Sequence, residues 1–334
     1  MPERRSRIRC RPVPPARQAM SLAEDVRAGL LSRPRSLPPK YFYDETGSLL
    51  FDRICDTQEY YPTRTEDDLL ARYASSIIGK VGPRHILELG SGTARKTRHL
   101  LQACCQQETV DYWPFDVCRE VLELSSETLS ECYPWLGVQP LLGDYSAGLE
   151  HLPVLDGPCL YVFLGGSLGN FEAPAAVELL SELAARMSAD DRLLLGVDRV
   201  KSPAVLEAAY DDAEGVTAAF NRNLLSVLNR ELEADFRIEH FAHRAIYNDP
   251  QAQVEMYLVA ERSQEVRLGK LEETLRFAEG ETILTEISRK FTLESASDML
   301  ADAGLHLDDH YTPPNQYFSL LLAAPQSNGH AAFI

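Results

Sequence analysis

Glycines and carboxylates follow several short apolar runs in this chain, in a pattern that could bind a nucleoside. The first run, residues 85–89, leads into Glu88-Leu-Gly-Ser-Gly92, whose glycines let the backbone approach a ligand closely. A helix can start after this turn, and the free N–H groups of a helix N-terminus favour polar ligands. Arg95 stands where the third glycine of a dinucleotide-binding loop would be, and there is no Gly-Lys-Ser/Thr phosphate loop. The turn therefore favours a nucleoside with an amino-acid tail over a dinucleotide.

Two acidic residues follow the next apolar runs and could complete a nucleoside site. Asp116 comes directly after the run 110–115 and is placed to accept hydrogen bonds from ribose hydroxyls. Asp144 and Tyr145 follow the run 139–142, and they could accept from an adenine amine and stack on its ring. Either aspartate taken singly could instead cap the N-terminus of a helix. Three run ends in this order favour the binding site.

A fourth apolar run, residues 159–164, leads into a glycine-rich segment that ends at Asn170. Glycines just past a buried strand, Gly165 among them, indicate backbone that packs against a ligand. The amide of Asn170 can donate and accept hydrogen bonds at once, which suits a zwitterionic amino acid. Without wider context, a turn residue that caps the following helix is the simpler interpretation of Asn170.

These segments must be positioned by an ordered set of strands and helices, and the hydrophobic pattern predicts one. Short apolar runs, continued at 192–197, alternate with stretches of helical periodicity such as 66–80 and 173–187. Strands that alternate with helices of this length form right-handed crossovers and a parallel sheet covered on both faces. Open sheets of this kind bind ligands at the carboxyl edge. We therefore predict a doubly wound α/β core whose glycines and acids meet at that edge.

Two regions depart from this alternation and predict a second lobe over the same edge. Residues 201–290 contain one long helical stretch, 204–232, followed by alternating segments that indicate an antiparallel α+β addition. Together with residues 21–64 they make the predicted substrate-binding lobe, and residues 65–200 and 291–325 make the core. The last two strands of the core are expected to pair antiparallel.

Both ends of the chain are predicted to lie outside the folded body. Residues 1–20 are rich in arginine and proline and lack both the apolar core of a secretory signal and an amphipathic helix. We therefore expect a disordered leader. Residues 326–334 are rich in small residues, and we expect a flexible tail.

The composition narrows the class of partner. The chain has 334 residues, with 33 lysines and arginines against 50 aspartates and glutamates, and a formal net charge of −17. Duplex nucleic acid requires a concentrated positive field, so this acidity argues against it as a main partner. Seven cysteines without CxxC spacing, and histidines without HExxH or HxH, predict reduced thiols, no metal site and a cytoplasmic location. No apolar run approaches the ~20 residues of a membrane span, and we expect a monomer.

The ordered motifs also resemble a known family. Glu88-Leu-Gly-Ser-Gly92 with Asp116, Asp144 and Gly165 is similar to the methyl-donor site of class I S-adenosylmethionine-dependent methyltransferases, which have a Rossmann-like α/β fold. Longer motifs within residues 21–324 resemble, more narrowly, the histidine-specific methyltransferases of ergothioneine biosynthesis. These motifs are Leu37-Pro-Pro-Lys-Tyr-Phe-Tyr-Asp44, Glu59-Tyr-Tyr-Pro-Thr-Arg-Thr-Glu66, Ala209-Tyr-Asp-Asp212, Val216-Thr-Ala-Ala-Phe-Asn-Arg-Asn223 and Leu284-Thr-Glu-Ile-Ser288. The arginine-rich leader lies outside the resemblance.

The resemblance implies a reaction and a set of site residues. The reaction is the transfer of three methyl groups from S-adenosylmethionine to the α-amino group of L-histidine, which gives the betaine hercynine. The resemblance implies that the amino acid is bound by Tyr43, Tyr60, Asn170, Tyr210, Glu286, Ile287 and Ser288, with Glu286 and Ser288 at the imidazole. It implies that the methyl donor is bound by Gly90, Lys96, Asp116, Asp144, Tyr145 and Gly165. No residue is identified as a dedicated base.

Three other functions remain open at this point. The same scaffold could methylate another amino acid such as tryptophan, although the carboxylate of Glu286 suits an imidazole N–H better than an indole. A nicotinamide-dependent oxidoreductase is disfavoured because Arg95 replaces the third glycine. A binding protein without catalytic activity would not need both the substrate-side and the donor-side residues.

Overall fold

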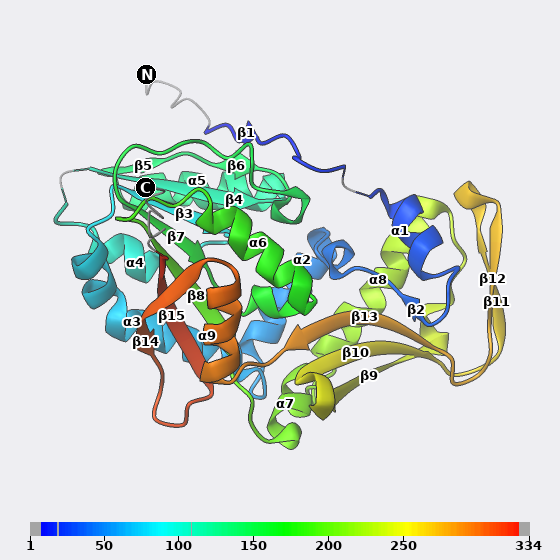
Figure 1. Ribbon diagram of the computed structural model, residues 1–334. Helices are drawn as coiled ribbons and strands as arrows, with labels where there is room; N and C mark the ends of the chain where they lie inside the picture. Colours follow the sequence, from blue (N-terminus) through cyan, green and yellow to red (C-terminus); the bar gives the residue numbers. More distant parts are fainter. Residues whose placement is uncertain (1–7, 19, 108, 327–334) are drawn as a thin grey trace, which may run out of the picture.

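Three β-sheets form among the described residues, and the two larger ones each belong to one lobe of the molecule (Figure 1). The computed structural model describes residues 8–18, 20–107 and 109–326. In Figure 1 the larger sheet lies on the left, and the smaller sheet lies at the lower right.

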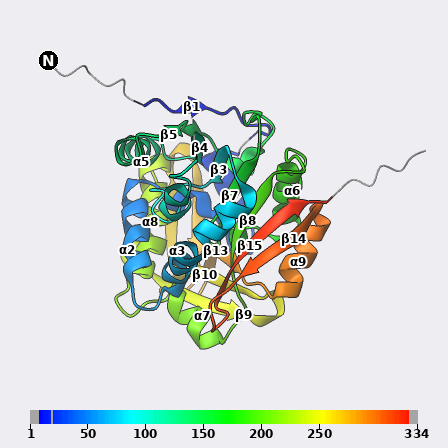
Figure 2. The same cartoon turned by 90° about the vertical axis from the view of Figure 1, so that its left-hand side faces the viewer.

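The larger sheet is parallel at its centre and antiparallel at one end. Its strands are β1 (Arg11–Pro12), β3 (His85–Leu89), β4 (Val110–Asp116), β5 (Leu136–Val138), β6 (Leu141–Leu142), β7 (Cys159–Phe163), β8 (Arg192–Asp198), β14 (Leu305–Tyr311) and β15 (Phe318–Pro325). Among the described residues the order is β1-β6-β4-β3-β7-β8-β15-β14, with β5 paired beside β4. Strand β15 runs antiparallel to both β8 and β14. Figure 2 shows β15 and β14 side by side at one end of the sheet. The predicted doubly wound sheet with an antiparallel last strand is confirmed.

A helical layer covers each face of this sheet. Side chains alternate between the faces, so Ile86 of β3 packs into one hydrophobic core and Leu87 packs into the other. The first layer consists of α3 (Tyr61–Val81), α4 (Arg98–Ala103) and α5 (Arg119–Cys132), and the second consists of α6 (Ala173–Ala184) and α9 (Leu293–Asp302). Because both faces are covered, the carboxyl edge of the parallel strands is where a ligand can reach the sheet.

The smaller sheet forms the second lobe, with strand order β2-β13-β10-β9. Its strands are β2 (Arg35–Ser36), β9 (Phe241–Asn248), β10 (Gln253–Ala260) and β13 (Thr282–Arg289), and a ribbon of β11 (Gln264–Leu268) and β12 (Glu273–Phe277) extends from it. Its helices are α1 (Leu22–Gly29), α2 (Glu45–Asp56), α7 (Pro203–Tyr210) and α8 (Val216–Leu232). All of these elements fall within residues 21–64 and 201–290, the ranges assigned to a second lobe from the sequence.

The single long helix expected at 204–232 is two helices, so that prediction is wrong. The carboxylate of Asp212 accepts hydrogen bonds from the backbone N–H groups of Val216 and Thr217, at 2.9 and 2.7 Å, and so caps the start of α8. Gly215 precedes α8 with a φ of 72°, a conformation that glycine adopts without strain. The break leaves Tyr210 at the end of α7, where it lines the pocket described below.

The arginine-rich leader is ordered where the structure describes it, which contradicts the prediction of disorder. Strand β1 pairs parallel with β6, and the side chains of Cys10 and Val13 are buried. Proline is compatible with such an edge strand, because an edge strand leaves part of its backbone unpaired. In Figure 1 this segment runs across the top of the molecule from β6 towards α1.

Parts of the predicted leader and tail lie outside the described residues. These are residues 1–7 and 19 of the leader and residues 327–334 of the tail. Gln326, the first residue of the predicted tail, donates its backbone N–H to the carbonyl oxygen of Gly304 at 2.8 Å.

Candidate active site

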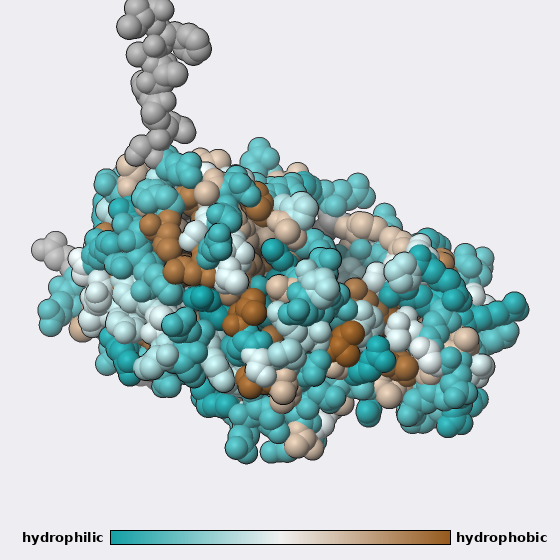
Figure 3. Space-filling model, turned by 60° about the horizontal axis from the view of Figure 1, so that its bottom comes forward, coloured by the Kyte–Doolittle hydropathy of each residue, from teal (hydrophilic) through white to brown (hydrophobic). Residues whose placement is uncertain are grey.

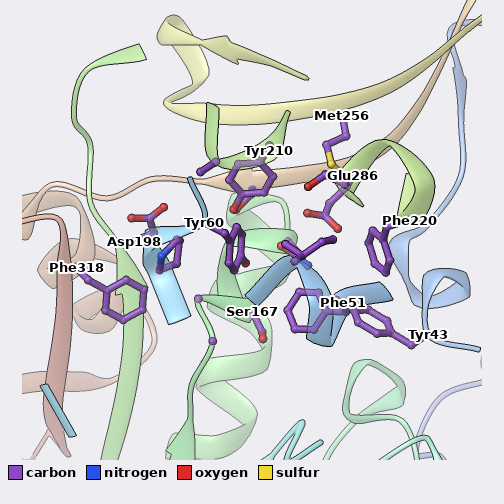
Figure 4. A pocket seen from close by; sticks show the side chains of 18 residues that line it. Tyr43, Phe51, Tyr60, Ser167, Asp198, Tyr210, Phe220, Met256, Glu286 and Phe318 are labelled. Atoms are coloured by element: carbon purple, nitrogen blue, oxygen red, sulfur yellow. The ribbon is translucent and has the colours of Figure 1, made fainter. Parts of the chain in front are cut away.

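A pocket lies between the two lobes, beside the carboxyl ends of β7 and β8 (Figure 4). Its empty volume, open solvent at the mouth included, is about 620 Å³. The core contributes Gly165, Gly166, Ser167, Asn170, Asp198 and Phe318 to its wall. Residues of the second lobe that line it include Tyr43, Phe51, Tyr60, Tyr210, Thr217, Phe220, Met256, Glu286 and Ser288.

The glycine turn after β3 forms a cradle beside this pocket. Gly90 has a φ of 67°, and a Cβ added there would lie 3.4 Å from the ring of Tyr145. The Tyr145 ring itself packs edge-on against Phe163, with 5.4 Å between ring centroids. Next to Gly90, the hydroxyl oxygen of Ser91 is buried and has no hydrogen-bond partner in the described part of the chain. A glycine backbone with a positive φ, an aromatic ring and an unpartnered hydroxyl fit a nucleoside.

The two aspartates predicted for this site hold the adjoining loops. Asp116 accepts a hydrogen bond from the backbone N–H of Gly92 at 2.8 Å, which ties the end of β4 to the glycine turn. Asp144 accepts from the N–H and the hydroxyl of Ser146 and caps a short helical turn, Tyr145–Ala147. The capping role that the sequence left open is therefore present for Asp144. Both carboxylates lie at strand ends beside the cradle.

Lys96 links the cradle to the pocket wall. Its ammonium forms an ion pair with Glu66, a fully buried carboxylate of α3. Glu66 also accepts the backbone N–H of Gly165 at 2.9 Å, and Gly165 lines the pocket with a φ of 80°. A charged amine held at this position can reach an anionic group that lies between the cradle and the pocket.

One side of the pocket is an aromatic wall. Tyr43 packs edge-on against Phe51 and Phe220, with ring centroids 5.7 and 5.9 Å apart. Tyr60 packs in the same way against Tyr210, at 6.0 Å. The faces of such rings attract organic cations, so this wall suits an ammonium group and its methylated forms.

Glu286 is a buried carboxylate that faces the pocket (Figure 4). Burial raises its pKa to about 7, although Lys290 acts in the opposite direction. Among the described residues its carboxylate has no hydrogen-bond or ion-pair partner, and Met256 lies directly across from it in the β10–β13 pairing. Buried carboxylates normally have a donor, so a ligand that brings an N–H to this position would satisfy Glu286.

Two hydroxyl groups of the pocket wall are held by a buried lysine. The Tyr210 and Ser288 oxygens lie 2.7 Å apart, and the Lys290 ammonium donates to them at 2.9 and 2.7 Å. The same ammonium lies 3.0 Å from Asp198. These contacts hold both hydroxyl oxygens in place.

Six of the seven residues predicted for the amino acid line this one pocket, namely Tyr43, Tyr60, Asn170, Tyr210, Glu286 and Ser288. Ile287 does not line it. Successive side chains of a strand point to opposite faces, so the residue between Glu286 and Ser288 is turned away. Of the residues predicted for the methyl donor, Gly90, Asp116, Asp144 and Tyr145 lie at neighbouring strand ends, and Lys96 and Gly165 meet through Glu66.

Sequence reasoning missed several residues of the site, most clearly Asp198, Lys290 and Glu66. Asp198 ends β8 as Asp116 ends β4, so its position at a strand end is a signal that could have identified it. Lys290 follows an apolar strand and Glu66 lies in an amphipathic helix, where charged residues usually face solvent. Only the fold shows that both are buried.

No group of three or more histidine, cysteine, aspartate and glutamate side chains among the described residues could hold a metal ion. None of the described helices is both long enough and apolar enough to span a bilayer.

Comparison with known proteins identifies relatives along nearly the whole chain. A family model described as histidine-specific, S-adenosylmethionine-dependent methyltransferase matches residues 22–325. A histidine N-alpha-methyltransferase of Mycolicibacterium smegmatis is 45% identical over 91% of this chain and 95% of its own length. The protein of that name from Mycobacterium tuberculosis is 42% identical over the same shares. Ergothioneine biosynthesis protein 1 of Neurospora crassa is 30% identical over 87% of this chain and 33% of its own length.

Proposed function

This chain belongs to the family of histidine-specific, S-adenosylmethionine-dependent methyltransferases, and we propose that it trimethylates the α-amino group of L-histidine to form hercynine. The reaction is the first step of ergothioneine biosynthesis, and one of the relatives is named for that pathway. Support comes from the match over residues 22–325 and from a pocket whose wall contains most of the residues expected for the amino acid.

The observation that carries the choice of histidine is Glu286. A buried carboxylate without a partner among the described residues costs free energy, and an imidazole N–H would remove that cost through a charge-assisted hydrogen bond. Ser288 lies two residues along the same strand face and can bond the second ring nitrogen. The pair thus suits a flat ring with a nitrogen on each side.

We propose that the other polar residues of the pocket orient the backbone end of the amino acid. Asn170 can donate to the α-carboxylate and accept from the α-amine, and Tyr60 and Tyr210, whose rings pack against each other in the wall, add two hydroxyls. The amine must be neutral and aligned with the methyl group when it attacks, because the transfer is an in-line displacement at carbon. Orientation alone can lower such a barrier by several kcal/mol, up to ~7–11 kcal/mol in well-aligned systems.

We assign the binding of the methyl donor to the cradle. The Tyr145 ring lies beside the Gly90 backbone and can stack on an adenine, and Asp116 and Asp144 are placed to accept from ribose hydroxyls and the adenine amine. Lys96 would hold the carboxylate of the amino-acid tail. When bound, S-adenosylmethionine supplies an electrophilic methyl group on its sulfonium. The aromatic wall then stabilises the positive charge that remains on the product.

A direct assay tests this proposal. The purified chain is incubated with S-adenosylmethionine and, separately, with each of the twenty amino acids, and products are followed by mass spectrometry. We expect three methyl groups on histidine and none on the others. Methylation of tryptophan or tyrosine with histidine untouched would overturn the substrate, and the absence of any turnover would overturn the enzyme.

We further propose that the protein acts as a monomer in the cytoplasm, without a nucleic-acid partner. The net charge of −17 opposes binding to phosphate backbones, and the seven cysteines lack the spacing of a disulfide framework. Light scattering during gel filtration tests the monomer, and a dimer at micromolar concentration would contradict it.

A further inference from the structure

A cluster of buried charges adjoins the pocket, and one of its members, Asp198, belongs to the pocket wall. Lys290 is fully buried, and the side chains of Asp198 and Lys201 are each only 5% exposed. Asp198 lies 3.0 Å from the ammonium of Lys290 and 2.5 Å from that of Lys201, and it also accepts from the Tyr61 hydroxyl at 2.8 Å. Figure 4 shows Asp198 on the far side of Tyr210 from Glu286. The cluster thus contains one carboxylate and two amines, and burial lowers the pKa of Lys201 to about 8.

Burying such a cluster is costly, so its contacts indicate what it does. Burial opposes the ionised form of Asp198, yet Lys290 and Lys201 hold the pKa of Asp198 below its usual value. Burial lowers the pKa of Lys290, but Tyr210 and Asp198 outweigh it and the net shift is upward. Lys290 is therefore a permanent cation, and its three N–H donors are all used by Tyr210, Ser288 and Asp198.

A count of protons then limits how the two hydroxyls can be oriented. Lys290 has no acceptor, so the oxygens of both Tyr210 and Ser288 must accept from it. The two oxygens also form one hydrogen bond with each other, which uses the proton of one hydroxyl. One hydroxyl proton is left over, and no described residue accepts it. Because both residues line the pocket, that proton is available to an acceptor atom of a ligand.

We propose that Lys290, held by Asp198, is a positioning residue that makes the Tyr210–Ser288 pair present one hydrogen-bond donor to the bound amino acid. This inference rests on the proposed function and extends it to residues that do not themselves contact the reacting atoms. Without the ammonium, both hydroxyls could turn and accept from each other or from water, and the pocket would lose its fixed donor.

The same cation also acts on Glu286. The titratable groups that face Glu286 are Lys290 and the tyrosines Tyr43, Tyr60 and Tyr210, and only Lys290 among them carries a charge at neutral pH. Met256 and Phe220, which come from the neighbouring strand and helix, carry none. We expect histidine binding to weaken at low pH as Glu286 becomes protonated, and we call this decrease the acid limb of the pH profile. Removing the cation would raise the pKa of Glu286 and therefore move the acid limb to higher pH.

The test compares Lys290→Met with Lys201→Met as a matched control. Lys201 donates to the same Asp198. It also contacts Tyr61, the ring of Tyr317 and the carbonyl oxygen of Arg199, and none of these residues lines the pocket. Calorimetry measures the binding of L-histidine to each variant in the presence of S-adenosylhomocysteine. We expect Lys290→Met to weaken histidine binding about tenfold or more, with unchanged binding of S-adenosylhomocysteine and an acid limb at higher pH. Lys201→Met should lose stability without this selective effect.

The outcomes separate the inference from the proposed function. If the unaltered protein binds no histidine, the proposed function fails. If it binds histidine and the two variants weaken histidine and S-adenosylhomocysteine binding alike, Lys290 is only structural and the inference is overturned. A double variant gives a further check. Lys290→Met should weaken histidine binding less when it is introduced into the Ser288→Ala variant than when it is introduced into the unaltered protein. If Lys290→Met does not fold, Lys290→Gln keeps N–H donors without the charge, and it must still move the acid limb to higher pH; an unmoved limb overturns the inference.

Discussion

Glu286 shows how a single side chain can identify a ligand. Its carboxylate is buried in the second lobe, it faces the pocket, and its pKa of about 7 places its ionisation near neutral pH. The carboxylate form is the one that accepts an imidazole N–H, so histidine binding should improve as the pH rises through this pKa. In the opposite direction, protonation below pH 7 removes the negative charge that strengthens this hydrogen bond.

The first prediction concerns Glu286→Gln, which keeps the shape of the side chain and removes the charge. We expect kcat/KM for histidine at pH 8 to fall about 10- to 100-fold, because a hydrogen bond to a charged group contributes about 1.5–3 kcal/mol. The acid limb near pH 7 should disappear, and the affinity for S-adenosylhomocysteine should not change. Steady-state rates between pH 6 and 9 and calorimetry measure these effects.

Glu255→Gln is the matched control for this prediction. Glu255 lies in the neighbouring strand β10 and accepts hydrogen bonds from Asn248, Gln253 and Tyr257, and it is absent from the pocket wall. Its substitution should leave the acid limb in place. An acid limb that persists in Glu286→Gln would show that another group controls the pH dependence.

The residues of the site differ in how far the sequence could identify them. Glu286, Ser288 and Tyr210 belong to long motifs, and Asp116 follows an apolar run. Both kinds of signal can be recognised in the amino-acid sequence. Lys290 and Asp198 are 92 positions apart in the chain, and their pairing depends on β13 meeting the end of β8. No local pattern records that contact, and a lysine is normally placed on the surface.

At the scale of elements, the strands of the core could be predicted because they are buried on both faces. Buried parallel strands are continuous apolar runs, and β3, β7 and β8 are such runs. The break between α7 and α8 was not predicted, because apolar residues continue with helical spacing on both sides of it. Asp212 and Gly215 decide the break, and each residue is common in other contexts.

The leader was also mispredicted, for a reason that leads to the second prediction. Its composition is that of a disordered segment, but its backbone bonds an exposed sheet edge. Val13 donates its N–H to the Leu142 carbonyl oxygen at 2.8 Å, and Ala16 and Arg17 donate theirs to the carbonyl oxygen of Ala147 at 3.0 and 2.9 Å. The segment therefore supports the loop that carries Asp144 and Tyr145.

Removal of residues 1–17 should weaken the binding of S-adenosylhomocysteine about fivefold. This corresponds to ~1 kcal/mol, the order of the cost of fixing one residue of backbone in a loop that the leader no longer holds. Hydrogen exchange should become faster in residues 143–148, and the KM for histidine should change little. Removal of residues 1–9 alone is the control, since it keeps β1, and equal binding by the two truncated chains would refute the role of the leader.

At the scale of the whole molecule, the net charge of the protein and the contacts of the pocket affect ligand binding separately. The net charge of −17 gives the protein a negative field, and Figure 3 shows a largely hydrophilic face with hydrophobic residues in separate groups. The first 17 residues contain six arginines and one glutamate, so the rest of the chain is more acidic than the total suggests. Histidine as a zwitterion has no net charge and should not respond to this field.

The methyl donor and its demethylated product should respond differently to the field of the protein, which gives the third prediction. S-Adenosylmethionine carries one more positive charge than S-adenosylhomocysteine, because its sulfur is a sulfonium. Raising the ionic strength from about 0.01 M to about 0.15 M shortens the Debye length from ~30 Å to ~8 Å and screens the field of the protein. The affinity for S-adenosylmethionine should therefore fall severalfold, while the affinities for S-adenosylhomocysteine and histidine stay within about twofold. Calorimetry at the two salt concentrations measures all three affinities. An equal loss of affinity for S-adenosylmethionine and S-adenosylhomocysteine would show that the buried contacts of the cradle outweigh the global charge.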